Sequence, residues 1–243
     1  MSGSSFYNYK KTHSIVLLAV CNAKYQFSLL DIGNSGRQSD GSVYANSQLG
    51  YAIENDLLDI PQACKVNGTE TILPYVFVGD NAFGLKPQMM KPYPFCNLSY
   101  KKRIFNYRLS RVRRIVENAF GIAASRFRIF RRSFIASTKK VVLITKAVVA
   151  LHNFLMSKRK ESLNYDYCPN TYIDQDGQNE LIPGEWRKEI GDVQGLQDIS
   201  NSACNNHSKD ARKIRNNFKK YFNTDGAVDW QWSLINNTSY QKD

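Results

Sequence analysis

The feature that most constrains the fold is a long apolar repeat between Phe105 and Phe127. Apolar side chains recur there at every third or fourth position, as they do along one face of an α-helix. The repeat consists of Phe105, Leu109, Val112, Val116, Phe120, Ala123 and Phe127. It predicts one long helix that packs by this stripe against a core.

Shorter patterns on either side predict both strands and helices. Two apolar runs, SIVLLAVC and FSLLDIG, flank the polar NAKYQ, which is typical of an antiparallel hairpin over 14–33. We expect a helix over 43–55, a strand over 73–80, a further strand over 133–137 and a second amphipathic helix over 139–156. The chain is therefore placed in the α/β class.

Composition and charge restrict the partners. The 243 residues are 42% apolar, which is enough for a real core, and the formal net charge is +12. The basic excess between residues 86 and 160 favours a polyanion, first of all nucleic acid, over a merely solvated basic surface. The apolar run at 15–21 is too short to span a bilayer, so no membrane partner is expected. The five cysteines are scattered and have no metal-ligand spacing, which indicates reduced thiols.

Two carboxylates stand out by position. Asp80 ends the expected strand, and Glu117 lies on the flank of the apolar stripe, with a basic sequence between them. Carboxylate oxygens suit a hard divalent cation that activates water on a phosphate ester. The alternatives are a turn aspartate at Asp80 and an ordinary helix ion pair at Glu117. His152 and Asn153 lie on an apolar helix and are interpreted as a packing pair.

Four blocks of the sequence resemble the DDE endonuclease domain of Harbinger (PIF/Harbinger) transposases and their domesticated relatives. The blocks are HSIVLLAVCNAKYQFSLLDIGNSGRQSDGSVYANSQL, LPYVFVGDNAFGLKPQMMKPYP, FNYRLSRVRRIVENAFGIAASRFRIF and VVLITKAVVALHNFL. They occur in the family's order and cover about 13–154, and the terminal RNNFKKYFNTDGAVDWQ is similar to the family's tail.

The resemblance implies an RNase H-like mixed sheet with flanking helices. Asp80 of the GD block and Glu117 of the VEN-FG block then correspond to catalytic, metal-binding acids, with Mg²⁺ or Mn²⁺ as the cofactor. The family's first catalytic Asp belongs to an upstream strand with no counterpart here, so we expect an N-terminally truncated domain that lacks its first core strand. Asp40 is a further candidate metal ligand, and the alternative for it is a helix N-cap.

Arginines around the two acids are candidate phosphate contacts, because the forked guanidinium binds phosphate oxygens. The predicted DNA-binding set is Arg108, Arg111, Arg113, Arg114, Arg128, Arg131 and Arg132. The resemblance also implies a nuclear location and a Myb/SANT-like partner protein, and it leaves a homo-oligomer open.

Two functions follow as hypotheses. The first is a metal-dependent DNA endonuclease, a transposase-derived hydrolase that cleaves phosphodiester bonds and transfers strands. The second is a non-catalytic, domesticated nuclear protein that binds DNA or a partner. The expected organisation is an endonuclease-like domain over 1–160, a polar, loosely ordered extension over 161–208 and a basic amphipathic tail over 209–243.

Overall fold

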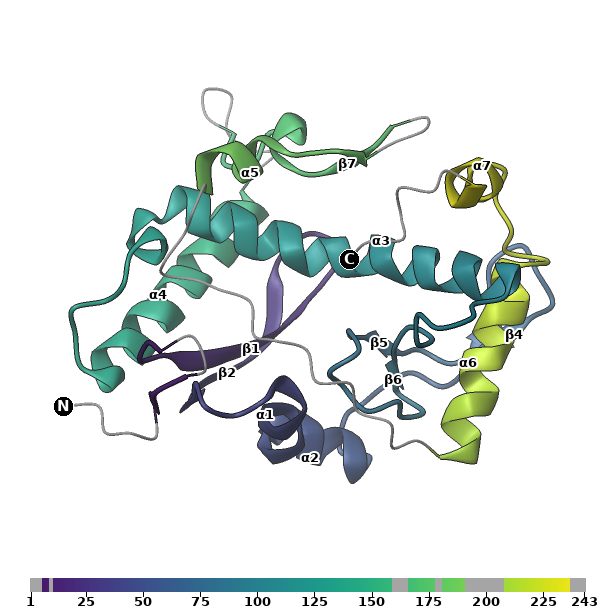
Figure 1. Cartoon of the computed structure of the whole chain (residues 1–243), viewed down its shortest axis with the longest axis horizontal. Coiled ribbons are helices and arrows are strands. Elements are labelled where there is room, and N and C mark those ends of the chain that lie inside the picture. The colour runs from purple at the N-terminus through teal and green to yellow at the C-terminus, as the bar shows by residue number, and fades with distance from the viewer. Residues whose placement is uncertain (1–5, 9–10, 159–165, 178–180, 191–207, 237–243) are drawn as a thin grey trace. The chain divides into compact units, whose positions relative to one another are not determined.

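The computed structural model describes residues 6–8, 11–158, 166–177, 181–190 and 208–236 (Figure 1). These residues form two compact units. Unit 1 holds the described residues up to Leu49, those from Arg114 to Gly177 and those from Leu181 to 190. Unit 2 holds Gly50–Arg113 and 208–236. Each unit is described by itself.

The predicted hairpin is confirmed in unit 1. Strand β1 (Ile15–Cys21) pairs antiparallel with β2 (Phe27–Ser35). The turn between them is closed by Asn22, whose Oδ1 accepts hydrogen bonds from the backbone N–H groups of Lys24 (2.9 Å) and Gln26 (3.1 Å). A short polar side chain that binds its own turn explains why the NAKYQ segment reverses the chain.

The second predicted amphipathic helix is also confirmed, as α4 (Thr138–Ser157), which begins after the N-cap Ser137. The polar pair at its end ties it to the hairpin. His152 is fully buried, with Nδ1 2.8 Å from the Tyr167 hydroxyl and Nε2 2.8 Å from the Tyr25 carbonyl oxygen. Burial lowers the pKa of His152, so the neutral ring is favoured.

Asn153 completes this packing role. Its side chain accepts from the N–H of Phe27 (2.9 Å) and donates to the Phe27 carbonyl (2.8 Å). Phe27 in turn packs with Ala119, Ala123 and Val149 in one apolar cluster. Helix α4, the second half of α3 and the hairpin therefore share a core, and the predicted packing role of the pair agrees with these contacts.

Helix α4 alone, among the described helices, has the length and mean hydropathy that a membrane span needs. Core helices meet the same criteria, and α4 buries Val148, Val149 and Met156 while Leu151 and Phe154 are exposed. Length and composition do not distinguish a membrane-spanning helix from a core helix. The expectation of no membrane partner therefore stays a prediction.

The long predicted helix is α3 (Tyr100–Arg126), and it runs through both units. Its stripe residue Phe105 is fully buried and Ala123 nearly so, whereas Val112 is 51% exposed. Phe127 lies just beyond the helix and packs in the unit 1 core, as expected. The apolar period thus located the helix correctly.

Three sequence predictions of local structure were wrong in detail. The helix expected over 43–55 is two helices, α1 (Asp40–Asn46) and α2 (Gln48–Glu54), separated by the extended Ser47. The strand expected over 73–80 is two strands, β4 (Ile72–Leu73) and β5 (Phe77–Val78), because Pro74 between them has no N–H to donate to a ladder.

The third error is the strand expected over 133–137. No strand forms there, and Ile135 is fully exposed. The short β-branched and aromatic run has no neighbouring strand to pair with among the described residues, so it serves as an extended lead into the N-cap of α4.

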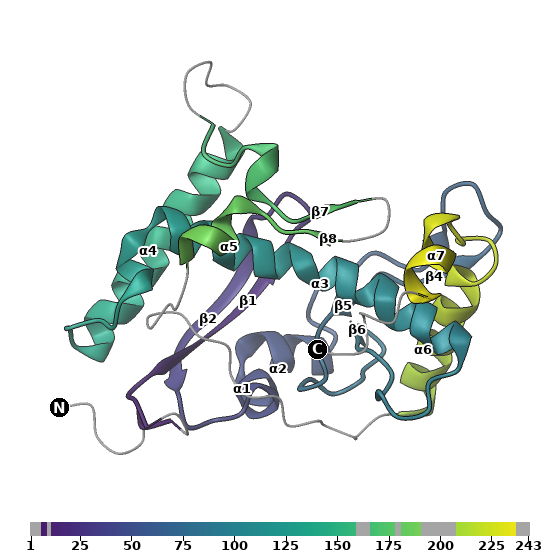
Figure 2. The ribbon, with the colours of Figure 1, turned by 45° about the horizontal axis from the view of Figure 1, so that its top comes forward.

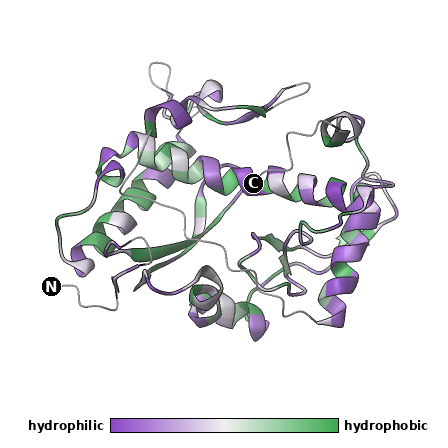
Figure 3. Ribbon diagram, in the orientation of Figure 1, coloured by the Kyte–Doolittle hydropathy of each residue, from purple (hydrophilic) through white to green (hydrophobic). Residues whose placement is uncertain are grey.

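Unit 2 is built around the first half of α3. Strand β4 pairs antiparallel with β3 (Cys64–Lys65), and β5 pairs parallel with β6 (Met89–Met90). Helix α6 (Lys209–Phe222) packs its apolar side on this core, with its polar side outward (Figure 3), and α7 (Trp230–Asn236) follows. The cluster consists of Leu85, Met90, Tyr93, Phe105, Leu109 and Ala211.

The segment after α4 adds structure to unit 1. It contains a 3-10 turn (Asn170–Tyr172), the antiparallel pair β7 (Gln175–Asp176) and β8 (Leu181–Ile182), and helix α5 (Glu185–Ile190). Figures 1 and 2 show these elements alongside the second half of α3. Residues 159–165 and 191–207 lie outside the described residues, and the expected boundaries at 160 and 208 stay predictions.

The described strands form four two-stranded sheets, and helices alternate with them along the chain. The α/β class is therefore confirmed as a mixed arrangement of helices and small sheets. The RNase H-like arrangement expected from the resemblance stays a prediction.

Candidate active site

Asp80 lies in unit 2, two residues beyond β5, in a tightly held loop. The N–H of Gly79 donates to the Met90 carbonyl (2.9 Å), and a Cβ at Gly79 would lie 2.7 Å from the Phe83 ring. The Asp80 Oδ1 accepts from the N–H of Ala82 (2.9 Å). The turn role considered for Asp80 is thus present, and it uses one carboxylate oxygen of a half-buried residue.

Lys91 helps to close the same loop, which the sequence did not indicate. Its side chain is 7% exposed, and Nζ donates to the Asn81 carbonyl (3.1 Å). A buried ammonium that binds a carbonyl next to Asp80 anchors the loop on β6, because a buried charge requires a partner. The only available signal was the apolar setting of the lysine in QMMKPYP.

Glu117 lies in unit 1, on the second half of α3, and its side chain is 42% exposed. Nη2 of Arg187, on α5, lies 3.8 Å from Oε2 of Glu117. This cation comes from a segment far along the chain.

Arg187 is itself fixed by a buried carboxylate. Its Nε and Nη2 donate to the two carboxylate oxygens of Asp174 at 2.9 and 2.6 Å, and the Asp174 side chain is fully buried. The Gly184 N–H also donates to Asp174 (2.8 Å). Burial by itself raises the pKa of Asp174, but these hydrogen bonds and the positive charges of Arg187 and Arg114 outweigh it and lower the pKa.

Asn118, the residue after Glu117, binds the same segment. It is 2% exposed, and its Oδ1 accepts from the N–H of Asp174 (3.1 Å) and from Nε1 of Trp186 (2.7 Å). One turn later, a Cβ at Gly121 would lie 2.3 Å from the Trp186 ring, so only glycine admits this contact. The VEN-FG block therefore positions the segment beside Glu117.

Sequence reasoning missed Asp174, Trp186 and Arg187. One signal was available, because Asn118 and Gly121 are poor helix formers in the middle of a long helix. Such residues indicate a close or polar contact, although the sequence does not say with which segment.

Asp40 is the first residue of α1 in unit 1. The N-cap of that helix is Ser39, whose side chain accepts from the N–H of Ser42 (3.4 Å). The alternative that made Asp40 the N-cap is thus wrong by one residue. Its proposed role as a metal ligand stays a prediction.

Several arginines predicted to bind phosphate have partners within the protein. Arg114 pairs with Asp176 (2.6 Å) and Arg131 with Glu189 (3.1 Å), both in unit 1. In unit 2, Arg108 donates to the Gly226 carbonyl and to the Gln231 side chain, both at 3.2 Å.

The other predicted arginines differ in setting. The guanidinium of Arg111 lies 3.8 Å from the centroid of the Trp230 ring, and Arg113 is half-buried on the same helix. Arg128 and Arg132 are exposed. The DNA-binding role of the whole set stays a prediction, and Arg128 and Arg132 are its most accessible members.

A metal site was tested against these positions. Asp80 belongs to unit 2, whereas Glu117 and Asp40 belong to unit 1. Within the part of the chain that the structure describes, no group of three or more His, Cys, Asp or Glu side chains could hold a metal ion. The carboxylates have the right chemistry for a hard cation, but the described residues do not complete a metal site.

Residues 1–153 match the family model for DDE superfamily endonucleases. The chain belongs to this family. No curated protein and no solved structure matches the chain. The matched region of this DDE endonuclease contains Asp40, Asp80 and Glu117, and it ends before the segment that carries Asp174 and Arg187. Members of the DDE superfamily typically use divalent metal ions.

Proposed function

We propose that the chain is a Harbinger-type transposase domain that cleaves phosphodiester bonds of DNA and transfers strands, with Asp80 and Glu117 as its catalytic acids. The family match over both acids carries this proposal. The setting of Glu117 supports it, because a half-exposed carboxylate is held between a rigid helix and a guanidinium that a buried aspartate fixes. An RNase H-like arrangement of the domain belongs to the same proposal.

The residues of the chain have distinct tasks in this function. Asp80 offers a carboxylate from a closed turn, so its position varies little. Arg187 restricts the carboxylate of Glu117, since opposite charges attract at this distance. Preorganised charged groups at the reacting phosphate are a major source of catalysis in phosphoryl transfer.

Mg²⁺ or Mn²⁺ is the proposed cofactor, held by Asp80 and Glu117 with Asp40 as a further candidate ligand. Such an ion activates the attacking water and stabilises the leaving oxygen. The described residues do not complete this site, so we assign no geometry to it.

The decisive experiment is nicking of a DNA duplex by the full chain with Mg²⁺ or Mn²⁺. Asp80→Asn and Glu117→Gln keep the side-chain shape and remove the charge, and we expect each to reduce nicking by roughly 10³-fold or more, since catalytic acids of this kind act as a unit. The matched control is Glu54→Gln, an acid on α2 that pairs with Lys86 at 2.8 Å. Nicking by the wild type that survives both substitutions would overturn the assignment.

One observation favours a second function. The net charge of +12 also suits the alternative, a domesticated nuclear protein that binds DNA or a protein partner without cutting. Folded protein that binds duplex DNA and never nicks it with either metal would support this alternative. A Myb/SANT-like partner, a nuclear location and a homo-oligomer are proposals that follow only from the family resemblance.

A further inference from the structure

Three cations surround one aromatic ring in unit 2. The guanidinium carbon of Arg215 lies 4.0 Å from the centroid of the Tyr93 ring, and the ammonium nitrogens of Lys102 and Lys219 lie 5.2 and 5.6 Å from it. Lys102 belongs to the first turn of α3, and the other two belong to α6. We call these three side chains and Tyr93 the Tyr93 cation cluster.

The platform under the cations is rigid. Tyr93 is 6% exposed, and its backbone N–H and carbonyl both bond to the side chain of Asn106, at 2.8 and 2.9 Å. Its hydroxyl donates to Oδ1 of Asn216 (2.8 Å), which also accepts from Nζ of Lys219 (3.2 Å). Both helices are thus held to the ring by side-chain hydrogen bonds, and the positions of the cations are preset.

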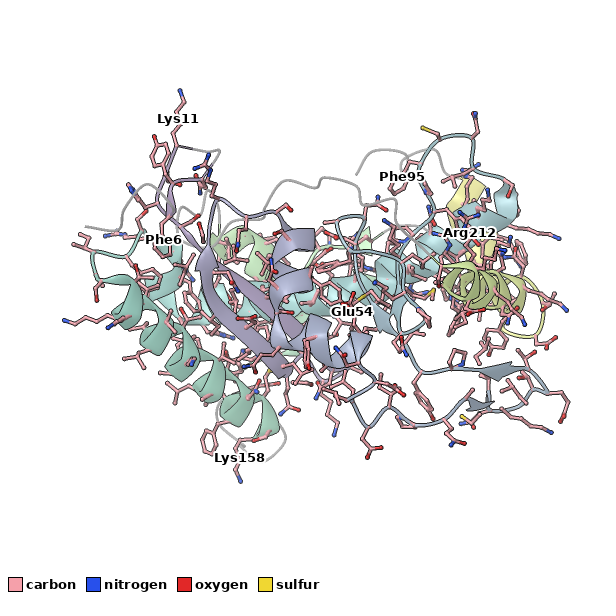
Figure 4. The ribbon with its side chains drawn as sticks, turned by 90° about the horizontal axis from the view of Figure 1, so that it is seen from below. Phe6, Lys11, Glu54, Phe95, Lys158 and Arg212 are labelled. Carbon is pink, nitrogen blue, oxygen red and sulfur yellow. The ribbon has the colours of Figure 1, made fainter. Side chains whose placement is uncertain are left out.

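Arg215 is the buried member of the cluster. It is 9% exposed, its Nη1 donates to the Pro92 carbonyl at 3.4 Å, and its Nε has no hydrogen-bond partner among the described residues. Burial lowers the pKa of Arg215, Tyr93 acts against this lowering, and the charge of Arg212 adds to it. Arg212 also lies on α6 (Figure 4). A buried cation with an unused donor is costly without a counter-ion.

Like charges also act on the more accessible members. Burial lowers the pKa of Lys219, and Lys102, Arg215 and Lys101 lower it further, in that order. None of the groups that act on Lys219 is acidic. Helix α6 has six basic residues and one acidic residue, Asp210, so the helix itself cannot balance the cluster.

Within the described residues, no carboxylate forms an ion pair with Lys102, Arg215 or Lys219. In unit 1, by contrast, the partly buried Arg187 has the buried Asp174. A preset group of cations that lacks an internal acid is suited to an anion from outside. Two ammonium groups and a guanidinium within 5.6 Å of the centroid of one ring offer donors of the kind that phosphate oxygens accept from.

We propose that the Tyr93 cation cluster is a binding site for a backbone phosphate of DNA, separate from Asp80 and Glu117. The choice of DNA rests on the proposed function, and the net charge of +12 favours the same polyanion. The site contacts backbone and not bases, so it contributes affinity and register without sequence preference. Tyr93 and Lys102 lie inside the matched region 1–153, whereas helix α6, with Arg215 and Lys219, lies outside it.

The test measures binding of a duplex DNA by the full chain, without divalent metal, over a range of salt concentrations. The variant is Lys102→Gln with Lys219→Gln, which spares the buried Arg215. We expect binding roughly tenfold weaker and a salt slope lower by about 2, one unit for each lost phosphate contact. The control is Lys24→Gln with Lys146→Gln, two exposed lysines of unit 1 with the same total charge change.

Equal losses in the variant and the control would overturn the proposal, because only net charge would then matter. Polyglutamate that binds the wild type but not the variant, while DNA binds both equally, would also overturn it, in favour of an acidic protein partner. Nicking is measured in parallel with saturating protein. If Glu117→Gln loses nicking but binds DNA as the wild type does, the proposed phosphate site stands. If the wild type binds DNA through the cluster but never nicks it, only the proposed function is overturned.

Discussion

Partly buried arginines lie near Glu117 in unit 1 and near Tyr93 in unit 2. The side chains that contact these arginines differ between the two regions. In unit 1, Arg114, Arg131 and Arg187 each pair with a carboxylate. These carboxylates, Asp176, Glu189 and Asp174, all come from the segment 174–189. These three arginines of unit 1 therefore have carboxylate partners within the unit.

In unit 2, three arginines lie against aromatic rings. Arg108 lies 4.7 Å from the centroid of the Phe222 ring, Arg111 3.8 Å from that of Trp230, and Arg215 4.0 Å from that of Tyr93. A ring attracts a cation but carries no net charge, so the positive charge persists. Arg187, paired with Asp174, lies beside the carboxylate of Glu117, whereas cations packed on rings keep a charge that an anion can pair with.

We expect the largest effect on stability from breaking the ion pair between Arg187 and Asp174. Asp174→Ala leaves Arg187 without its buried partner, and we expect the free energy of unfolding to fall by about 3 kcal/mol, at the lower end for buried pairs because the Arg187 side chain is 38% exposed. Denaturant titration measures the change. Asp176→Ala, at a pair whose acid is 37% exposed, should cost less than about 1 kcal/mol. If the free energy of unfolding fell by a similar amount in both variants, the buried Asp174 pair would contribute no more than the Asp176 pair.

The pH dependence of the same pair sharpens the comparison. The pKa of Asp174 is lower in the folded than in the unfolded chain, where it is about 3.9. Its stabilisation is thus complete above the unfolded value and is lost as the pH falls through the folded value. We expect the stability difference between the wild type and Asp174→Asn to be constant above about pH 5 and to narrow in acid. A difference that widens in acid would contradict the assigned direction.

A single substitution can give the Tyr93 cation cluster of unit 2 an internal carboxylate, like those of unit 1. Asn216→Asp places a carboxylate where Oδ1 already accepts from Tyr93 and Lys219. We expect the free energy of unfolding to rise by about 0.5–1 kcal/mol, since an exposed ion pair contributes this much. DNA binding should weaken, because the cluster then has an internal anion. Asn217→Asp, at an exposed neighbour on the same helix, is the control. Stronger DNA binding by Asn216→Asp would argue against an anion site.

The smallest expected effect is stabilisation by inorganic phosphate. A ligand that binds only the folded chain raises the free energy of unfolding, here by less than about 1 kcal/mol for a weak anion. Thermal unfolding of the wild type with phosphate, against chloride at the same ionic strength, measures it. The Lys102→Gln, Lys219→Gln variant should lose this increment, and an unchanged increment would show that phosphate binds elsewhere.

Local patterns predicted most elements that depend on near neighbours. The period of Phe105 to Phe127 located α3, and the alternation of apolar runs located β1 and β2. The errors arose where one residue interrupts a pattern or where a strand needs a partner. Pro74 divided one expected strand, and the run at 133–137 has no strand to pair with among the described residues.

The candidate acids were found from sequence because they belong to local blocks. Asp80 follows a β-strand run, and Glu117 lies on the flank of an apolar stripe, so both positions follow from short-range periodicity. Their charged neighbours could not be found in this way. Arg187 lies 70 positions after Glu117, counted as 187 − 117, in a segment whose own pattern is weak.

By itself, the sequence determined the class of the fold, the family of the chain, its excess of positive charge and the positions of the candidate acids, since these depend on composition and local order. Only the tertiary structure decided which cations are neutralised. Asp174 accepts both donors of Arg187 and Tyr93 lies beneath Arg215 because separate segments pack together. Charge pairing is a property of distance in space, and distance along the chain does not predict it.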